Sequence, residues 1–390
     1  MRKLKIFQCS VVSRNLVWTL IVYLCLLTGS AYAQRPRVRD LGINIGTLLP
    51  GPYNAITDVA GVLVGHVTLI SGEGELVVGR GPVRTGVTAV LPHGDDIYQN
   101  QVFAAADVLN GNGEMTGVEW VNERGLLEVP VVLTNTLSVG TAYNGVVAYM
   151  LKQDTNRVPL PVVAECYDGG LNDIAGRHVK EAHVIQAIES ARGGPVSEGS
   201  SGAGTGMRAY GFKAGIGTAS RVLPEDRGGY TLGVLVNANC GRRPELLVAG
   251  LPVGPELAIQ TPPRTRDGSI VILVATNAPL IPIQLRRLCK RAALGLARTG
   301  TVSRTSSGDL ILAFSTAHRI PRNRATLDSV RTLRDSRLTP LFQATVEATE
   351  EAILNALCRA DTMVGRDNNT IPGLPLNRLV EVLKRHGRIQ

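Results

Sequence analysis

A polar loop runs directly into a buried strand at Thr265-Arg266-Asp267-Gly268-Ser269-Ile270-Val271-Ile272-Leu273-Val274-Ala275. The loop is the end of residues 251–267, which are rich in Pro, Arg and Thr and show no periodic apolar pattern. Ile270–Ala275 is instead a continuous apolar run with several β-branched side chains, as expected of a strand covered on both faces. The Gly268–Ser269 bond therefore lies at the boundary between exposed and buried chain.

Apolar runs of strand and helix length continue on both sides of this boundary. We expect strands at residues 56–59, 62–69, 87–91, 129–134, 160–164, 230–236 and 310–314, and helices at 140–152, 179–191, 282–297, 341–357 and 377–386. Buried strands with helices before and after them favour a layered α/β fold in which helices cover both faces. The sequence shows no internal repeat.

The Gly-Ser pair is also suited to self-cleavage. Glycine has no Cβ, so the carbonyl of Gly268 can be approached closely and its backbone tolerates strained angles. The Ser269 hydroxyl can attack that carbonyl and convert the amide into an ester, which water then hydrolyses. The new α-amine has an unperturbed pKa of about 7.7–8.0, so it can act as a base at neutral pH. By itself, however, a Gly-Ser pair at such a boundary is most simply a turn.

The composition argues against several other classes of protein. The chain has 390 residues, of which 44% are hydrophobic and 19% charged, which suits a globular protein with a sizeable core. The net charge of +9 is spread thinly and no nucleic-acid motif accompanies it, so we expect a solvated basic surface and no nucleic-acid partner. The six histidines lack metal-ligand spacing, so we expect no metal and no cofactor.

The N-terminus has the pattern of a secretory signal peptide. Basic residues within the first 14 positions precede the apolar run 16–27, and the cleavage signature Ala31-Tyr32-Ala33 follows it. The run is shorter than the about 20 residues of a membrane span, although an uncleaved anchor is the alternative. We expect residues 1–33 to be removed, so that the mature protein begins at Gln34 and is periplasmic or secreted. Four cysteines then remain, for which one disulfide is possible but not required.

Several motifs spread over about residues 40 to 365 carry a specific resemblance. They are Ile56-Thr57-Asp58-Val59, Gly117-Val118-Glu119-Trp120, Leu133-Thr134-Asn135-Thr136, Ala164-Glu165-Cys166-Tyr167-Asp168-Gly169, Gly202-Ala203-Gly204-Thr205-Gly206, Lys213–Arg221, Val234–Asn239, Asp267-Gly268-Ser269 and Ser306-Ser307-Gly308-Asp309. In this order they resemble the self-processing aminopeptidases that include L-aminopeptidase/D-esterase enzymes and β-peptidyl aminopeptidases. The resemblance implies a four-layer αββα sandwich like that of N-terminal-nucleophile hydrolases, with different connectivity.

The resemblance also implies a nucleophile and an oxyanion donor. Ser269 would be both the autocleavage residue and the nucleophile, so that one domain becomes an α-fragment, residues 34–268, and a β-fragment, residues 269–390. Asn239 would donate its side-chain amide to the oxyanion of the tetrahedral intermediate. Without the resemblance, Asn239 would be interpreted as the cap of a turn at the end of a strand.

Four further residues complete the implied site. Ser307 and Asp309 would form a hydrogen-bond relay that orients the amine and hydroxyl of Ser269, although Ser-Ser-Gly-Asp alone suggests a turn. Glu165 would bind the substrate's free ammonium, and Tyr167, on the same side of an extended chain, would complete the substrate pocket or the oxyanion site. A surface salt bridge and a core aromatic are the simpler interpretations of these two. Cys166 is expected to face away from the site.

We therefore expect an exported, autoprocessed serine aminopeptidase that removes N-terminal residues from short peptides, amino-acid amides or esters, including β-peptides. A D-amino-acid amidase or esterase of the same mechanism is the alternative, followed by a non-catalytic exported protein of this fold and a polyanion-binding protein. The loop Gly202–Gly206 lacks the Lys-Ser/Thr ending of a phosphate-binding loop, so we expect a tight turn near the cleft. The cleaved fragments are expected to stay together as a heterodimer and to form a tetramer of heterodimers.

Overall fold

The computed structural model describes residues 35–257, 268–322 and 329–389, and residues 36–390 form one compact unit. The expected signal peptide and most of the loop that precedes Ser269 lie outside the described residues. Among the described residues, no helix is long and apolar enough to cross a membrane. The four cysteines beyond the expected signal peptide are buried, and each is a free thiol.

One sheet has six strands in the order β4-β3-β14-β13-β10-β9. Their bounds are β4 (Leu126–Leu127), β3 (Asn100–Gly111), β14 (Gly308–Pro321), β13 (Ile270–Thr276), β10 (Thr231–Ala238) and β9 (Ile216–Val222). β13 pairs in parallel with β14, whereas the other neighbours in this sheet are antiparallel. Every residue of β13 is buried, as its apolar run predicts.

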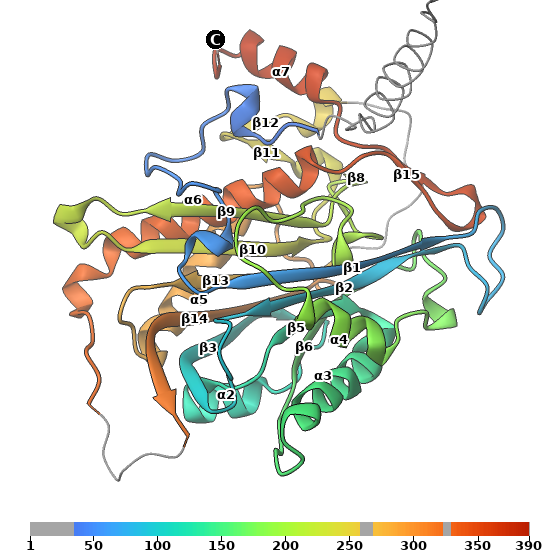
Figure 1. Ribbon diagram of the computed structural model, residues 1–390. Coiled ribbons are helices and arrows are strands. Elements are labelled where there is room, and N and C mark those ends of the chain that lie inside the picture. Colours follow the sequence, from blue (N-terminus) through green and yellow to red (C-terminus); the bar gives the residue numbers. More distant parts are fainter. Residues whose placement is uncertain (1–34, 258–267, 323–328, 390) are drawn as a thin grey trace, which may run out of the picture. The chain divides into compact units, whose positions relative to one another are not determined.

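The second sheet has four strands in the order β1-β2-β5-β6. Their bounds are β1 (Leu63–Ser71), β2 (Val83–Leu91), β5 (Val131–Asn135) and β6 (Val162–Cys166). Helices α3 (Val139–Gln153) and α4 (Glu181–Glu189) pack on this sheet, and α5 (Pro282–Ala297) and α6 (Thr339–Cys358) pack on the other one. The two sheets therefore lie between two pairs of helices (Figure 1), which is the predicted four-layer αββα sandwich.

The remaining elements are short or peripheral. They are α2 (Val118–Arg124), α7 (Leu376–Arg385) and the two-residue strand pairs β7 (Arg208–Ala209) with β8 (Phe212–Lys213), β11 (Leu247–Val248) with β12 (Leu251–Pro252), and β15 (Met363–Val364) with β16 (Thr370–Ile371).

Side chains of β13 alternate between two hydrophobic cores. Ile270, Ile272 and Val274 pack in the core that includes residues of α5 and α6. Val271 and Leu273 pack in the core that includes residues of the second sheet. Because successive side chains of a strand point to opposite faces, a strand buried in both cores must be apolar at every position.

The predicted strand at residues 56–59 is wrong, because Ile56–Asp58 forms a single 3₁₀ turn, η2. The Asp58 carboxylate accepts hydrogen bonds from the Tyr53 N–H at 2.9 Å and the Ala55 N–H at 3.0 Å. These local bonds satisfy backbone donors that a strand would pair with a neighbour. The strands β3 and β9 were not predicted, since alanine and glycine interrupt their apolar alternation.

A buried ion cluster joins β9 to α6. The Arg221 guanidinium, which is fully buried, contacts Glu347 at 3.1 Å and Glu351 at 2.7 Å. It also donates to the Ile45 carbonyl at 2.7 Å, and Arg39 pairs with Glu351 at 2.7 Å. The cluster therefore fixes the N-terminal segment to α6 on the outer face of the six-stranded sheet.

Replacing Arg221 by Met is expected to lower the free energy of unfolding by about 3–5 kcal/mol, because buried Glu347 loses its arginine partner and buried Glu351 loses one of its two. The matched control is Arg227→Met, which removes an exposed arginine from the turn after β9 and should change stability by less than about 0.5 kcal/mol. Urea denaturation followed by circular dichroism measures both. Equal stability of the two variants would show that the cluster contributes nothing.

Candidate active site

Ser269 lies at the start of the central strand β13, and its side chain is buried. Its carbonyl oxygen accepts a hydrogen bond from the Asn239 N–H at 3.0 Å, which extends the pairing of β13 with β10 by one residue. Its Oγ accepts a hydrogen bond from the Gly308 N–H at 3.2 Å. Because the hydroxyl acts as acceptor in this bond, its own proton is available for transfer.

The residue before Ser269 must be glycine. A Cβ on Gly268 would lie 1.5 Å from the Asn239 carbonyl oxygen, so no side chain fits there. Beside this position is a recess of about 10 Å³, lined by Gly241, Arg242, Gly268, Thr301, Arg304 and Ser307. A recess of this size holds about one water molecule and is too small for a peptide.

Ser307 and Asp309 stand beside Ser269 because β13 and β14 are parallel and in register, with Ile270 opposite Asp309. The Ser307 hydroxyl donates to Asp309 Oδ1 at 2.6 Å. Burial raises the pKa of the Asp309 carboxyl, whereas the Ser307 and Ser303 hydroxyls lower it. Within the described part of the chain, the buried Oδ2 of Asp309 accepts no hydrogen bond.

Two hydrogen bonds hold the side-chain amide of Asn239 in one orientation. Its Nδ2 donates to the Tyr167 carbonyl at 3.0 Å, and its Oδ1 accepts from the Arg208 N–H at 3.0 Å. The second hydrogen of Nδ2 is left for another acceptor. The Tyr167 side chain is 40% exposed, and its hydroxyl lies against Gly169, where a Cβ would be 2.4 Å away. Tyr167 therefore contacts Asn239 through its backbone carbonyl group and not through its hydroxyl.

Glu165 lies inside β6, two residues further into the strand than the sequence predicts, and its carboxylate is buried. Oε1 accepts from the Glu114 N–H at 3.2 Å, and Oε2 accepts from the Thr136 hydroxyl. Burial raises the pKa of Glu165, and the bonds from Thr136 and the Glu114 backbone lower it. The carboxylate is thus held in one position with no cationic partner among the described residues.

Gly113 lies between Glu165 and Gly308, the residue that donates to Ser269. A Cβ on Gly113 would lie 3.2 Å from Glu165 Oε1 and 3.2 Å from the Gly308 Cα, so these groups are neighbours. Gly308 in turn donates to Ser269. The structure thereby brings the predicted residues to one region, where β13 and β14 begin and β6 and β10 end. Cys166 faces the core between the sheets, with its Sγ 3.6 Å from the Asn237 carbonyl.

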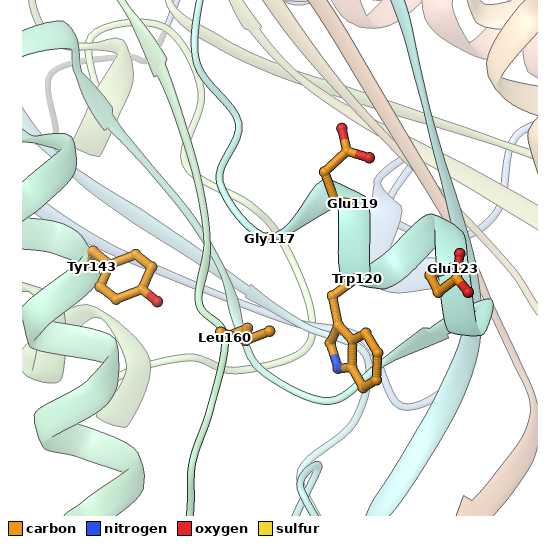
Figure 2. A pocket seen from close by; sticks show the side chains of 6 residues that line it. All are labelled: Gly117, Glu119, Trp120, Glu123, Tyr143 and Leu160. Atoms are coloured by element: carbon orange, nitrogen blue, oxygen red, sulfur yellow. The ribbon is translucent and has the colours of Figure 1, made fainter.

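A larger hollow, of about 460 Å³, lies between α2 and α3. It is lined by Gly117, Glu119, Trp120, Glu123, Tyr143 and Leu160. Figure 2 shows Tyr143 on one side, Trp120 on the other and Leu160 between them. Leu160 precedes Glu165 by five residues, which is about 16 Å of extended chain, so the Leu160 side of the hollow lies away from the Glu165 carboxylate.

Sequence reasoning missed the donors that hold the site. Thr136 and the N–H groups of Glu114, Gly308 and Arg208 were given no role. Thr136 and Gly308 lie inside motifs that carry the family resemblance, which is the signal that marks them. The backbone donors have no residue-type signature, because any residue other than proline has an N–H.

These groups can carry out acyl transfer. The Ser269 hydroxyl is buried and can act as a nucleophile, the Ser307–Asp309 pair adjoins it, and the Asn239 amide has an N–H that can stabilise an oxyanion. Glu165 supplies a buried negative charge at the same edge of the sheets. The arrangement fits the attack of a hydroxyl on a carbonyl whose substituent carries a positive charge.

Comparisons with known proteins agree with this chemistry. The profile of Peptidase family S58 matches residues 54–371. The chain is 49% identical over 381 residues to the β-peptidyl aminopeptidase BapA of Sphingosinicella microcystinivorans, a match that covers 93% of this chain and 96% of the relative.

Two solved structures are also similar. The β-aminopeptidase of a Burkholderia species has a TM-score of 0.85 and 46% identity, covering 90% of this chain and 99% of that one. An L-aminopeptidase D-Ala-esterase/amidase from Ochrobactrum anthropi has a TM-score of 0.85 and 43% identity, covering 91% of this chain and 100% of that one. It is described as a prototype of the serine aminopeptidases and a new variant of the Ntn hydrolase fold. The protein therefore belongs to peptidase family S58 and is a serine aminopeptidase with a variant Ntn hydrolase fold.

Proposed function

We propose that the chain cuts its own Gly268–Ser269 bond, and that Ser269 then removes single N-terminal residues from short peptides, amino-acid amides or esters through an acyl-enzyme. The observation that carries this proposal is the buried Ser269 hydroxyl, which accepts the Gly308 N–H at 3.2 Å next to the Ser307–Asp309 pair. Asn239 is the oxyanion donor and Glu165 binds the substrate ammonium.

In the cleavage step, Ser269 Oγ bonds to the Gly268 carbonyl carbon, the C–N bond breaks, and the hydroxyl proton moves to the departing nitrogen. The product is an ester with a free α-amine. Water then hydrolyses the ester, which leaves a carboxylate on Gly268 and restores the hydroxyl. The recess of about 10 Å³ beside Gly268 supports this step, because it has room for the attacking water.

The two fragments, residues 34–268 and 269–390, would remain one folded unit. β13 and β14 belong to the second fragment, and they lie in the sheet between β10 and β3 of the first. Cleavage removes one covalent bond but leaves these strand pairings intact, which supports a stable heterodimer. We extend the proposal to a tetramer of such heterodimers.

In each turnover, the α-amine of Ser269 takes the hydroxyl proton as Oγ attacks the substrate carbonyl. Asp309 supports this role, because its buried Oδ2 accepts no hydrogen bond from the described residues of the uncleaved chain. A new N–H on Ser269, adjacent to the register pair of Ile270 and Asp309, would supply that donor. The carboxylate would then hold and orient the amine.

The substrate class is inferred from the site and from the names of relatives. The buried Glu165 favours substrates with a free ammonium, which restricts cleavage to N-terminal residues. A β-peptidyl aminopeptidase and a β-aminopeptidase among the relatives support β-amino acids at that position. The name of the Ochrobactrum enzyme makes D-amino-acid esters and amides the second candidate class. The N-terminal signal pattern supports export to the periplasm or the medium.

Purified wild-type protein is expected to give two bands of roughly 25 and 13 kDa on a denaturing gel, scaled by fragment length from 41.5 kDa. Ser269→Ala is expected to give one band and no hydrolysis of aminoacyl anilides, since it lacks the attacking oxygen. Ser306→Ala is the matched control, because this neighbouring serine is exposed, and it should still give two bands. An uncut wild-type chain that hydrolyses anilides would refute the mechanism.

Asn239→Asp is expected to lower kcat for an aminoacyl anilide by about 10²–10³, the loss typical of one oxyanion donor. The substitution keeps the shape of the side chain and the oxygen that accepts the Arg208 N–H at 3.0 Å, but it loses the hydrogen bond to the Tyr167 carbonyl, so two bands on a denaturing gel must first show that the variant has matured. Steady-state kinetics on the variant measure kcat and KM separately. A change in KM alone would show that Asn239 binds the ground state and not the oxyanion.

Thr136→Val is expected to move the acid limb of the kcat/KM profile to higher pH. Burial raises the pKa of Glu165 and the Thr136 hydroxyl lowers it, so loss of the hydroxyl leaves the pKa higher still. Substrate binding needs the ionised carboxylate and is lost as pH falls through this pKa. Ser138→Ala is the matched control, because the buried Ser138 hydroxyl forms no bond to described residues. If the acid limbs of the kcat/KM profiles of Thr136→Val and wild type coincide, Glu165 is excluded as the group that titrates there.

A further inference from the structure

Arg208 is a cation next to the oxyanion donor that the proposed mechanism does not use. Its backbone N–H donates to Asn239 Oδ1 at 3.0 Å, and it opens the short strand β7 (Arg208–Ala209) directly after the glycine-rich turn. Because the backbone N–H of Arg208 is bonded to Asn239, the side chain of Arg208 starts beside the proposed oxyanion donor.

The guanidinium of Arg208 lies against the loop that follows β6. A Cβ on Gly170 would be 3.3 Å from its Nη1 and 3.5 Å from its Cζ. Burial lowers the pKa of Arg208, and the nearby Tyr167 hydroxyl raises it. Within the described chain this guanidinium forms no ion pair and no hydrogen bond, in contrast to Arg221, which contacts two carboxylates.

A half-buried charge without a counter-ion costs free energy, because lost hydration is not replaced. An anionic ligand would compensate for the lost hydration. The planar guanidinium suits a carboxylate that binds through both oxygens. Pairs with protein carboxylates are the usual solution, yet none is made here among the described residues. A half-buried guanidinium without a protein carboxylate beside it points to a ligand whose carboxylate binds Arg208.

The Glu165 carboxylate and the backbone of Arg208 adjoin different neighbours of the strand that follows Ser269. Glu165 adjoins Gly113 and Gly308 on the β14 side of β13, whereas Arg208 is bonded to Asn239 on the β10 side. The strands β14 and β10 are about 10 Å apart across β13, since neighbouring strands are spaced by about 4.8 Å. An extended dipeptide has a length of the same order, since each residue adds up to about 3.6 Å.

We propose that Arg208 binds the C-terminal carboxylate of the leaving group, so that the preferred substrates are zwitterionic dipeptides, including those with an N-terminal β-amino acid. The proposal rests on the proposed function, in which Ser269 is the nucleophile and Glu165 takes the ammonium. With the two ends of a dipeptide paired to opposite charges, the scissile carbonyl is fixed between them, beside Ser269. A longer peptide lacks a carboxylate at this position and loses the contact.

The test compares a dipeptide with its C-terminal amide, which has the same acyl group, the same leaving residue and no negative charge. Wild type is expected to have a kcat/KM for the dipeptide about 10- to 100-fold above that for the amide, as charge-assisted pairing predicts. Arg208→Met should lower kcat/KM for the dipeptide at least tenfold more than for the amide, mainly through KM. Arg208→Lys keeps the positive charge but not the paired N–H donors of the guanidinium, so its kcat/KM for the dipeptide should lie between those of Arg208→Met and wild type.

Arg227→Met is the matched control, since it also removes one positive charge, at the exposed turn at the far end of the β9–β10 pair. It should leave the ratio of dipeptide to amide unchanged. Two bands on a denaturing gel show that each variant has folded and matured. Equal losses on dipeptide and amide in a matured Arg208→Met, or a wild type that does not prefer the carboxylate, would overturn the proposal. Failure of the proposed function is a different result, namely hydrolysis of both substrates by Ser269→Ala.

Discussion

The parallel pairing of β13 with β14 is the constraint on which the rest of the site depends. Two strands that run in the same direction start at the same edge of a sheet, so the residues before them become neighbours. Ser269 precedes one strand, and Ser307 precedes the other by a single residue, with Ile270 opposite Asp309. A shift of register would separate the hydroxyl from the carboxylate. Close packing of both strands in two cores opposes such a shift, because each side chain fills a space of its own size and shape.

The sequence and the family resemblance predicted the layers, which the structure confirms, and named the candidate site residues. Long apolar runs such as Ile270–Ala275 predict central strands, because only a strand covered on both faces lacks polar alternation. The family resemblance supplied Asn239, Glu165, Ser307 and Asp309, and the structure brings all four to one edge. It also supplied Tyr167, whose carbonyl, and not its hydroxyl, meets Asn239.

Three features were beyond sequence reasoning, each for a physical reason. The residues near Asp58 form a turn because their side-chain hydrogen bonds are local, which an apolar pattern does not record. The strands β3 and β9 contain small residues whose burial depends on the helix above them, as with Gly217, where a Cβ would lie 1.9 Å from the Ala352 carbonyl. The donors from Gly308 and Glu114 belong to the backbone, so no residue type reveals them.

The order of strands in the six-stranded sheet has a consequence for synthesis of the chain. A ribosome makes residues 100–111 and 231–238 first, yet β3 and β10 have no contact until β13 and β14 occupy the space between them. A polypeptide that ends before β13 therefore carries two open strand edges and lacks Ser269, the proposed nucleophile. In the proposed mechanism, hydrolysis therefore begins only when residues 269–390, the last third of the chain, have been made, and a truncated translation product is inert toward cellular peptides.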